Sequence, residues 1–185
     1  MQMTPDNGIK TYSRLFFALW PDEATRQALT QLSKTFDTQA GKPAAPDNFH
    51  VTLVFLGNVN LETAALLKQY APDISAEPFE LTFESLSYWQ QPKILCATCK
   101  NIPQPIVALA SKLDALARQC GLRTDIRSYV PHITLVRHAQ FIPDQAIKPV
   151  VWSAEAFCLV QSCSEPEGVC YRVLRRWPLR LEKTS

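Results

Sequence analysis

The sequence contains no long hydrophobic run and no block of like charge. None of its apolar stretches approaches the roughly 18 residues that a membrane-spanning helix needs. The segment Met1–Lys10 is polar and rich in turn residues, unlike a secretory signal. The chain also lacks the run of five or more like charges that marks a nucleic-acid-binding tail. We therefore expect a soluble, cytoplasmic protein that does not bind membranes, with residues 1–12 as a flexible N-terminal tail.

The six cysteines lack the spacing of a metal site. Cys96 and Cys99 match the pattern C-x-x-C, but they fall in a predicted strand, where residues three apart point to opposite faces. Four and six residues separate Cys158, Cys163 and Cys170, so no second C-x-x-C completes a zinc site. We expect reduced, buried thiols and neither a metal nor another cofactor.

Size and composition favour one globular domain with a substantial core. The chain has 185 residues, of which 46% are hydrophobic, and no linker divides residues 13–185. Its charge is uneven. Residues 1–92 carry 6 Lys and Arg against 10 Asp and Glu, a balance of −4, whereas residues 93–185 carry 13 against 7, a balance of +6. This asymmetry indicates an anionic partner met mainly by the second half, or else ordinary surface variation.

Hydrophobic periodicity and turn residues predict a chain of helices and strands. Three helices are expected over residues 23–36, 62–70 and 104–119, and seven strands over 14–20, 49–56, 79–89, 93–99, 132–136, 154–161 and 169–176. Asp22 has the position of a helix N-cap, and Gly121 that of a helix stop. Gly57 and Asn58 are expected to end the second strand.

Two segments of the chain are nearly identical. His50-Val-Thr52-Leu-Val recurs 82 residues later as His132-Ile-Thr134-Leu-Val. With 13 threonines and 3 histidines in the chain, two chance pairs of His and Thr at this spacing have a probability of about 0.015. Residues two apart on a strand share a face, so each His would lie beside its Thr. Because each repeat follows a helix and a turn-rich loop, we expect two related lobes whose motifs face each other.

These segments resemble those of the two-histidine phosphoesterase superfamily, and particularly its bacterial and archaeal RNA 2′,3′-cyclic phosphodiesterase branch. Segments 14–18, 49–57, 131–137 and 171–177 carry the resemblance and are distributed over nearly the whole chain. It implies a bilobal α+β fold, in which each lobe has an antiparallel sheet with helices on the outside and a central groove lies between the sheets. It also implies a metal-independent enzyme whose substrates are RNA or nucleotides with a 2′,3′-cyclic phosphate. Val130 departs from the branch, in which a His often precedes the proline.

Two histidines suit the opening of a cyclic phosphate, because they can supply a base and an acid near neutral pH. The resemblance assigns His50 as the general acid that protonates the leaving 3′-oxygen and His132 as the general base that activates water, giving a 2′-phosphate. Thr52 and Thr134 would bind the non-bridging phosphate oxygens. With a 5′-hydroxyl in place of water, the same geometry would form a 2′-5′ linkage. The near-symmetry of the repeat leaves open, from the residues alone, which histidine is the acid.

Three further residues leave alternatives open. Arg137 ends the second motif strand five residues after His132, so alternation places it on the other face. A strand end or a bend would bring its guanidinium to a phosphate or ribose, and otherwise it is a surface arginine. Of Phe16 and Phe17, one is expected in the core and the other in the groove as a base-stacking platform, and the resemblance favours Phe17 for the groove.

Other conspicuous side chains are expected to be structural or solvated. His138 has no Thr partner and is predicted at the surface. A cluster of four arginines either follows an RNA backbone or is simply solvated, and the four tryptophans are expected to be buried. These residues are Arg172, Arg175, Arg176 and Arg180, and Trp20, Trp89, Trp152 and Trp177.

Three functions are compatible with the sequence. The first is an RNA 2′,3′-cyclic phosphodiesterase that acts as a monomer. The second is a related phosphoesterase acting on another cyclic phosphate or on a 3′-terminal oligonucleotide. The third is a non-catalytic RNA-binding protein, which would have no need for a paired acid and base.

Overall fold

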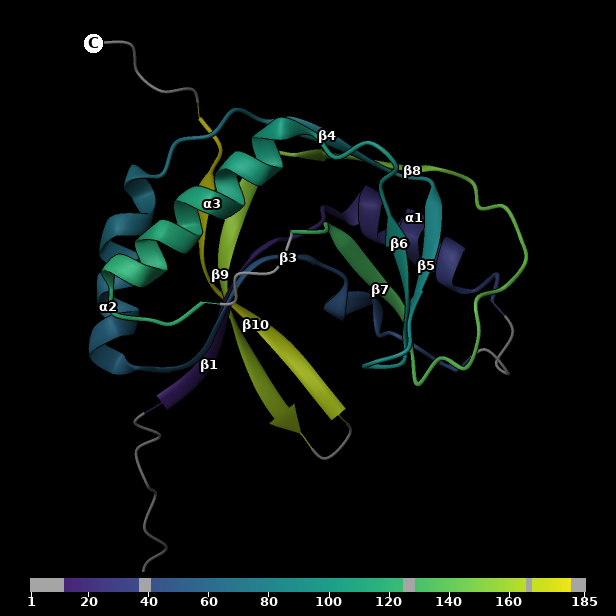
Figure 1. The fold of residues 1–185 in the computed structure, drawn as a ribbon, viewed down its shortest axis with the longest axis horizontal. Coiled ribbons are helices and arrows are strands. Elements are labelled where there is room, and N and C mark those ends of the chain that lie inside the picture. Colours follow the sequence, from purple (N-terminus) through teal and green to yellow (C-terminus); the bar gives the residue numbers. More distant parts are fainter. Residues whose placement is uncertain (1–11, 37–40, 125–128, 166–167, 181–185) are drawn as a thin grey trace, which may run out of the picture.

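The computed structural model of the chain describes residues 12–36, 41–124, 129–165 and 168–180. Its helices are α1 (Glu23–Ser33), α2 (Leu61–Tyr70) and α3 (Gln104–Gln119), with short 3₁₀ turns η2 (Pro46–Asn48) and η3 (Ala71–Asp73). Its strands are β1 (Tyr12–Leu19), β2 (Lys42–Pro43), β3 (Val51–Asn60), β4 (Phe79–Phe83), β5 (Ser85–Trp89), β6 (Ile94–Thr98), β7 (His132–Arg137), β8 (Val150–Ala154), β9 (Ala156–Glu165) and β10 (Gly168–Pro178). Figure 1 shows their arrangement. The α+β class expected from the sequence is confirmed.

Each motif strand lies in a different four-stranded sheet. The first sheet has the order β10-β9-β1-β3 and contains the strand that follows His50. The second sheet has the order β2-β7-β6-β5 and contains the strand that begins at His132. All pairings in both sheets are antiparallel. The expected N-terminal tail, residues 1–12, lies outside the described residues except for Tyr12, which begins β1.

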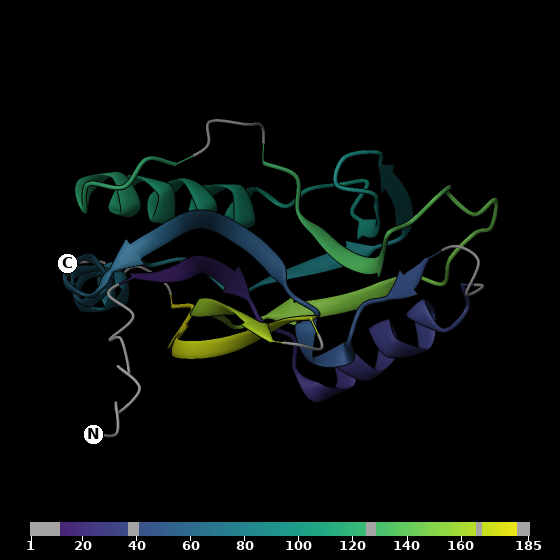
Figure 2. The same ribbon diagram turned by 90° about the horizontal axis from the view of Figure 1, so that it is seen from below.

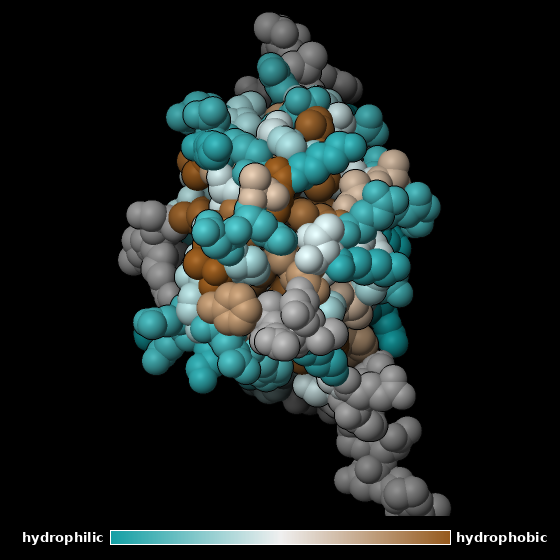
Figure 3. Space-filling view, turned by 90° about the vertical axis from the view of Figure 1, so that its right-hand side faces the viewer, coloured by the Kyte–Doolittle hydropathy of each residue, from teal (hydrophilic) through white to brown (hydrophobic). Residues whose placement is uncertain are grey.

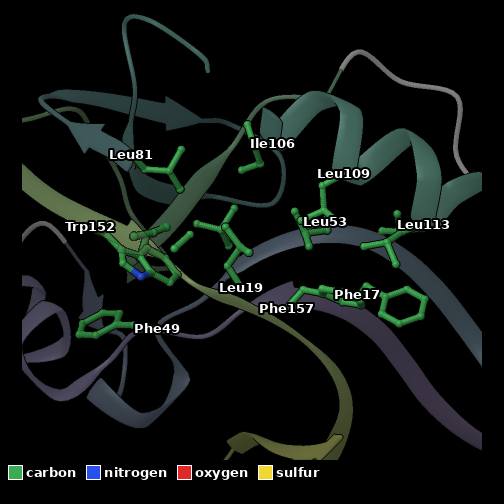
Figure 4. Close-up of a cluster of buried hydrophobic side chains, with 14 of the residues drawn as sticks. Phe17, Leu19, Phe49, Leu53, Leu81, Ile106, Leu109, Leu113, Trp152 and Phe157 are labelled. Atoms are coloured by element: carbon green, nitrogen blue, oxygen red, sulfur yellow. The ribbon is translucent and has the colours of Figure 1, made fainter. Parts of the chain in front are cut away.

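Each helix that precedes a motif strand packs against the lobe of the other motif. Helix α1 precedes β3 but contacts β7 and β8, whereas α3 precedes β7 but contacts β3. Figure 2 shows α1 and α3 on opposite sides of the strands. This exchange ties the two sheets together, and one continuous set of buried residues joins them. The core includes Leu53 of β3, Leu109 and Leu113 of α3, and Phe157 of β9 (Figure 4).

The helix ends follow the sequence signals. Asp22 caps α1, since its Oδ1 accepts a hydrogen bond of 2.7 Å from the backbone N–H of Thr25. After α3, Gly121 has a φ of +81°, and the backbone N–H groups of Gly121 and Leu122 donate to the carbonyls of Arg118 and Ala117. This is the Schellman arrangement, which favours glycine because of the left-handed backbone. Both predicted helix boundaries are therefore confirmed.

The structure corrects three predicted strands. The strand expected over 79–89 is two strands, since β4 pairs with β8 and β5 pairs with β6. Strand β8 was not predicted, and β9 reaches Glu165, into the segment expected to be a turn. Gly57 does not end its strand. It lies opposite Leu15 at a bulge with a φ of +72°, and β3 continues to Asn60.

The surface is mixed in character. At the end of the molecule formed by α1 and the segment 138–149, hydrophobic residues show between hydrophilic ones (Figure 3), and Phe141 and Ile142 are about half exposed. Within the described parts of the chain, none of the helices combines the length and apolar character needed to cross a bilayer.

Candidate active site

The two motif histidines are held in the same way. Nδ1 of His50 lies 2.7 Å from the backbone carbonyl of Asn48, and Nδ1 of His132 lies 2.9 Å from that of Val130. A carbonyl oxygen only accepts hydrogen bonds, so Nδ1 carries the proton in both rings. Each Nε2 is therefore left to accept a proton when the ring is neutral and to donate one when it is charged. The departure at Val130 does not disturb this arrangement, because only its backbone is used.

The charge of His132 acts on His50, which places the two imidazoles near each other. Burial is the main reason that the pKa of His50 is lowered to about 4; the charges of His132 and Arg137 act in the same direction, and the hydrogen bond to Asn48 opposes them. Burial also lowers the pKa of His132, and its bond to Val130 opposes this. The duplicated motif thus brings together two histidines that are neutral in the free protein at pH 7.

The motif threonines lie beside the histidines on the same sheet faces. Thr52 pairs with Ala18 of β1, and Thr134 pairs with Cys96 of β6, whose Sγ is 3.9 Å from the Thr134 hydroxyl. Both threonines are half-buried. Each threonine therefore lies on the same sheet face as its histidine, as strand alternation predicts.

A β-bulge explains why each threonine is followed by Leu-Val. In β7, Thr134 pairs with Cys96 and Val136 pairs with Leu95, so Leu135 is an extra residue with no partner on β6. The bulge lets both Leu135 and Val136 point into the core, where they are 0% and 1% exposed. The first motif has the same shift at Leu53.

The bulge also brings Arg137 to the histidine face. Past the extra residue the alternation is reset, and Arg137 lies opposite Ile94. Its Nη2 donates a hydrogen bond of 3.2 Å to the Tyr171 hydroxyl on the first sheet. Of the two alternatives left by the sequence, the structure therefore selects the one in which Arg137 reaches the groove between the sheets. The equivalent position of the first motif is Phe55, with the guanidinium of Arg14 4.9 Å from its ring centre.

Phe17 does not line the groove. It is completely buried in the core beside Phe157 (Figure 4), and its ring also lies 6.3 Å from that of Trp177. The neighbouring Phe16 faces the site instead, with its ring centre 5.1 Å from that of His50. The preference for Phe17 was therefore wrong. Strict alternation along β1 explains the outcome, because the residue next to a core side chain must face the other way.

Three further aromatic side chains surround the histidines, and the sequence did not reveal them. The Trp20 ring stacks on His50 at 5.7 Å and 11°, and Tyr171 approaches the same imidazole edge-on at 4.8 Å. Trp89 lies 4.3 Å from His132. Of the four tryptophans expected to be buried, only Trp152 is. Spacing along the chain could have indicated Trp20. It lies four residues after Phe16 and two before the helix cap, so strand alternation places it on the same face as Phe16.

The arginine cluster and His138 lie at the surface. All four arginines of the cluster are exposed. The bonds to Thr25 are the main reason that the pKa of Asp22 is lowered, and the charge of Arg176 adds to this. Burial raises the pKa of Cys158 to about 11, and Arg176 opposes that change. His138 is exposed at the end of β7, as expected. Among the described residues, no three His, Cys, Asp or Glu side chains converge as they would around a metal ion.

Known proteins share both the sequence pattern and the fold. The profile of the family described as LigT like phosphoesterase matches residues 19–95 and 97–171. The chain is 33% identical over 172 residues to the RNA 2′,3′-cyclic phosphodiesterase of Escherichia coli (strain K12), which covers 90% of this chain and 96% of that protein. The crystal structure of E. coli LigT in apo form matches with a TM-score of 0.84 and 30% identity, covering 92% of this chain and 99% of that one.

The structure of E. coli LigT complexed with 3′-AMP matches equally over the same shares of the two chains, with a TM-score of 0.82 and 30% identity. The family match includes both histidine motifs and most of the strands of both sheets. The resemblance inferred from the duplicated motif is thereby confirmed, and the chain belongs to the LigT-like phosphoesterase family.

Proposed function

We propose that this protein hydrolyses RNA 2′,3′-cyclic phosphate ends to 2′-phosphates by paired acid and base catalysis. The observation that carries the proposal is the matched pair of imidazoles, each with Nδ1 held by a backbone carbonyl and Nε2 left for proton transfer. The family supports the substrate class, because relatives that share most of the chain are named RNA 2′,3′-cyclic phosphodiesterases. A protein that only bound RNA would have no need for two such groups.

The proposed reaction is an in-line displacement. Nε2 of His132 takes the proton of a water molecule that attacks phosphorus, and Nε2 of His50 gives a proton to the departing 3′-oxygen. The P–O3′ bond breaks, and the phosphate stays on the 2′-oxygen. Because attack and departure occur on opposite sides of phosphorus, this chemistry needs its base and acid on facing surfaces. The proposal is supported by the placement of the two motif strands in different sheets and by the effect of the His132 charge on His50.

Charge on the phosphate oxygens needs stabilisation as it develops. The hydroxyls of Thr52 and Thr134 are proposed to donate to the non-bridging oxygens, and Arg137 to pair with the same group. The charge of Arg137 acts on His50, which supports its proximity to the proposed acid. A lowered pKa makes the imidazolium of His50 a stronger acid, in keeping with protonation of a poor leaving group. A 5′-hydroxyl in place of water would give the 2′-5′ linkage by the same path.

The direct test uses RNA ending in a 2′,3′-cyclic phosphate, incubated with the purified protein in EDTA. We expect 2′-phosphate product, resolved from 3′-phosphate by chromatography. Loss of turnover in EDTA, or 3′-phosphate as the product, would contradict the proposal. The variants His50→Ala and His132→Ala should each lose activity while circular dichroism shows an unchanged fold.

The assignment of acid and base has its own test. A substrate whose leaving 3′-oxygen is replaced by sulfur needs no protonation, because a thiolate is a much better leaving group. His50→Ala should regain activity on this substrate, and His132→Ala should not. The opposite pattern would exchange the two roles.

The lowered pKa values predict the pH dependence of the reaction. The competent form of the free protein holds one proton on the pair, and both pKa values lie below the ordinary value of about 6.5. The profile of kcat/KM should therefore be bell-shaped with a maximum below about pH 6.5. A maximum at neutral or alkaline pH would contradict these protonation states.

We also propose that residues 13–185 act as a single monomeric domain in the cytoplasm. The shared core of the two sheets supports one domain, and the buried thiols of Cys96 and Cys158 suit a reducing compartment. Light scattering of the purified protein tests the monomer. A dimer mass at micromolar concentration would be inconsistent with it.

A further inference from the structure

A basic cavity of about 390 Å³ is lined by Asn48, whose carbonyl holds His50, and by Arg137; apart from these two, its lining residues have no role in the proposed chemistry. Its walls include Lys42 on β2, Asn48, Arg137 and His138 at the end of β7, and Val169 at the start of β10. Arg137 belongs to both regions, since it lines the cavity and contacts Tyr171 in the groove. The cavity is therefore an extension of the groove beyond the scissile phosphate.

Two cations lie directly opposite each other in its wall. Lys42 pairs with Arg137 in the register of β2 and β7, so the two side chains leave the sheet on the same face, about 5 Å apart at Cβ. Like charges in this position destabilise a sheet unless an anion lies between them. None of the described lining residues is acidic. In the described parts of the chain, Lys42 and His138 form no side-chain hydrogen bond or ion pair.

The backbone around these cations is tightly constrained. A Cβ at Gly41 would lie 2.6 Å from the Arg137 carbonyl oxygen, so glycine is needed for β2 to approach β7. Lys93 and His138, with φ of 63° and 54°, are the non-glycine residues of the described chain with a left-handed backbone. The two lie at the same end of the second sheet, where the Ala139 N–H donates to the Lys93 carbonyl. Such conformations persist only where the surroundings fix them, and they are common at ligand sites.

The lining favours a phosphate over a base. The aromatic rings that could stack on a base are gathered at the histidines, whereas the cavity is lined by small, aliphatic and basic residues. Asn48 is engaged in holding the wall together, because its Nδ2 donates to the Val169 carbonyl at 2.8 Å. Lys42 and His138 are left to meet an anion that enters beside the scissile phosphate.

We propose that this cavity binds the phosphodiester on the 5′ side of the terminal nucleotide, with Lys42 as its main contact and His138 as a second. The proposal rests on the function proposed above and adds to it a subsite that recognises the strand beyond the terminal nucleotide. The protein selects polynucleotide ends over cyclic mononucleotides, and it does so by charge. Arg137 serves the scissile phosphate, and Lys42 serves the next one along the strand.

The test compares three substrates by kcat/KM. These are uridine 2′,3′-cyclic phosphate, the dinucleotide UpU with a 2′,3′-cyclic end, and the same dinucleotide with an uncharged methylphosphonate linkage. The wild-type protein should prefer the charged dinucleotide over the methylphosphonate by at least about tenfold, the usual effect of one charge-assisted hydrogen bond. Lys42→Ala should reduce this ratio to near one, whereas Lys42→Arg should keep most of it. His138→Ala should reduce it in part.

The exposed Lys34, which follows the last residue of α1 and does not line the cavity, gives the matched control, and Lys34→Ala should keep the wild-type ratio. Equal rates for the charged and uncharged dinucleotides in the wild type would overturn the subsite. An equal loss on all three substrates in Lys42→Ala would overturn it as well, because Lys42 would then act on the scissile phosphate. If the mononucleotide and the dinucleotides are all left intact by the wild type, the proposed function itself fails.

Discussion

Trp20 lies nearly parallel to the imidazole of His50, and Phe16 and Tyr171 contact the same ring. These rings exclude water from the histidine, and burial is the largest cause of its lowered pKa. Desolvation disfavours the charged form of an imidazole, because the aromatic surroundings replace few of the hydrogen bonds that water offers. The aromatic residues therefore control the protonation of the proposed acid.

Removing one of these rings should change the pKa of His50. In Trp20→Ala, water reaches the imidazole, and the pKa should rise from about 4 toward the ordinary value of about 6.5. NMR titration of the histidine ring protons measures this directly. Trp89→Ala is the matched control, because Trp89 lies against His132 and should leave the titration of His50 near its wild-type value. A His50 that still titrates near 4 without Trp20 would rule out this source of burial.

The aromatic residues of the site differ in how far the sequence specifies them. Phe17 of β1 faces the core, so alternation requires that Phe16 and Ala18 face the groove, and Trp20, one residue after β1, continues the same face. Tyr171 and Trp89 are different. They reach the histidines from β10 and β5, and their positions depend on strand pairings that no local pattern specifies.

At the scale of elements, the two β-bulges determine which motif side chains are buried. A regular strand would expose one of two consecutive residues, yet the Leu and Val of both motifs are buried.

Helix ends were predictable because Asp22 and Gly121 act through local hydrogen bonds. The bulges and the division of residues 79–89 were not, because each is set by the partner strand. Leu135 is extra only relative to β6.

The bulge at Leu135 gives Arg137 its place, and this has a kinetic consequence. Arg137→Gln should lower kcat/KM on a cyclic mononucleotide about 10- to 100-fold, because one charge-assisted bond to phosphate is lost. Tyr171→Phe should have a smaller effect, since its hydroxyl only orients the guanidinium. Steady-state kinetics measures both. Arg118→Gln on α3 serves as the control, and an equally active Arg137→Gln would mean that the guanidinium does not bind phosphate.

The two capped helices offer a comparison in stability. Asp22 caps α1 and Asn60 caps α2, each accepting a 2.7 Å bond from the backbone three residues on. Replacing either by Ala should cost about 1 kcal/mol at pH 7. The bonds to Thr25 lower the pKa of Asp22, so its contribution is present above the unfolded pKa and disappears as pH falls through the folded one.

Chemical denaturation at several pH values distinguishes the two caps. The cost of Asp22→Ala should shrink as pH falls below about 4, because the unfolded chain takes up the proton there and the folded protein does so only at lower pH. The cost of Asn60→Ala should stay constant, because an amide does not titrate. If both costs respond alike to pH, the lowered pKa of Asp22 does not come from its capping bond.

At the scale of the whole molecule, the fold holds two imidazoles in a groove where neither is readily protonated. Each lobe supplies one ring, and the exchanged helices α1 and α3 fix the lobes relative to each other. The arrangement suits catalysis, but it lowers the free energy of unfolding at acid pH. An unfolded chain exposes both rings to water and restores their ordinary pKa of about 6.5.

The stability of the protein should therefore fall as pH decreases from about 6.5 to about 4. In this window the unfolded chain binds a proton at His50 and the folded protein does not, so the free energy of unfolding decreases by up to about 1.4 kcal/mol per pH unit for this group. Below the folded pKa both states are protonated, and the effect of this group levels off. His132 acts in the same direction, because burial lowers its pKa too.

Urea denaturation of His50→Gln tests this reasoning. The variant lacks the titrating ring, so its free energy of unfolding should fall less steeply than that of the wild type between pH 6.5 and pH 4, and the two curves should converge toward acid. Asn60→Ala, which removes a cap without a titrating group, is the control and should run parallel to the wild type. Parallel curves for His50→Gln and the wild type would show that the groove does not hold His50 neutral, and the stacked Trp20 would then not be the means by which the fold controls its proposed acid.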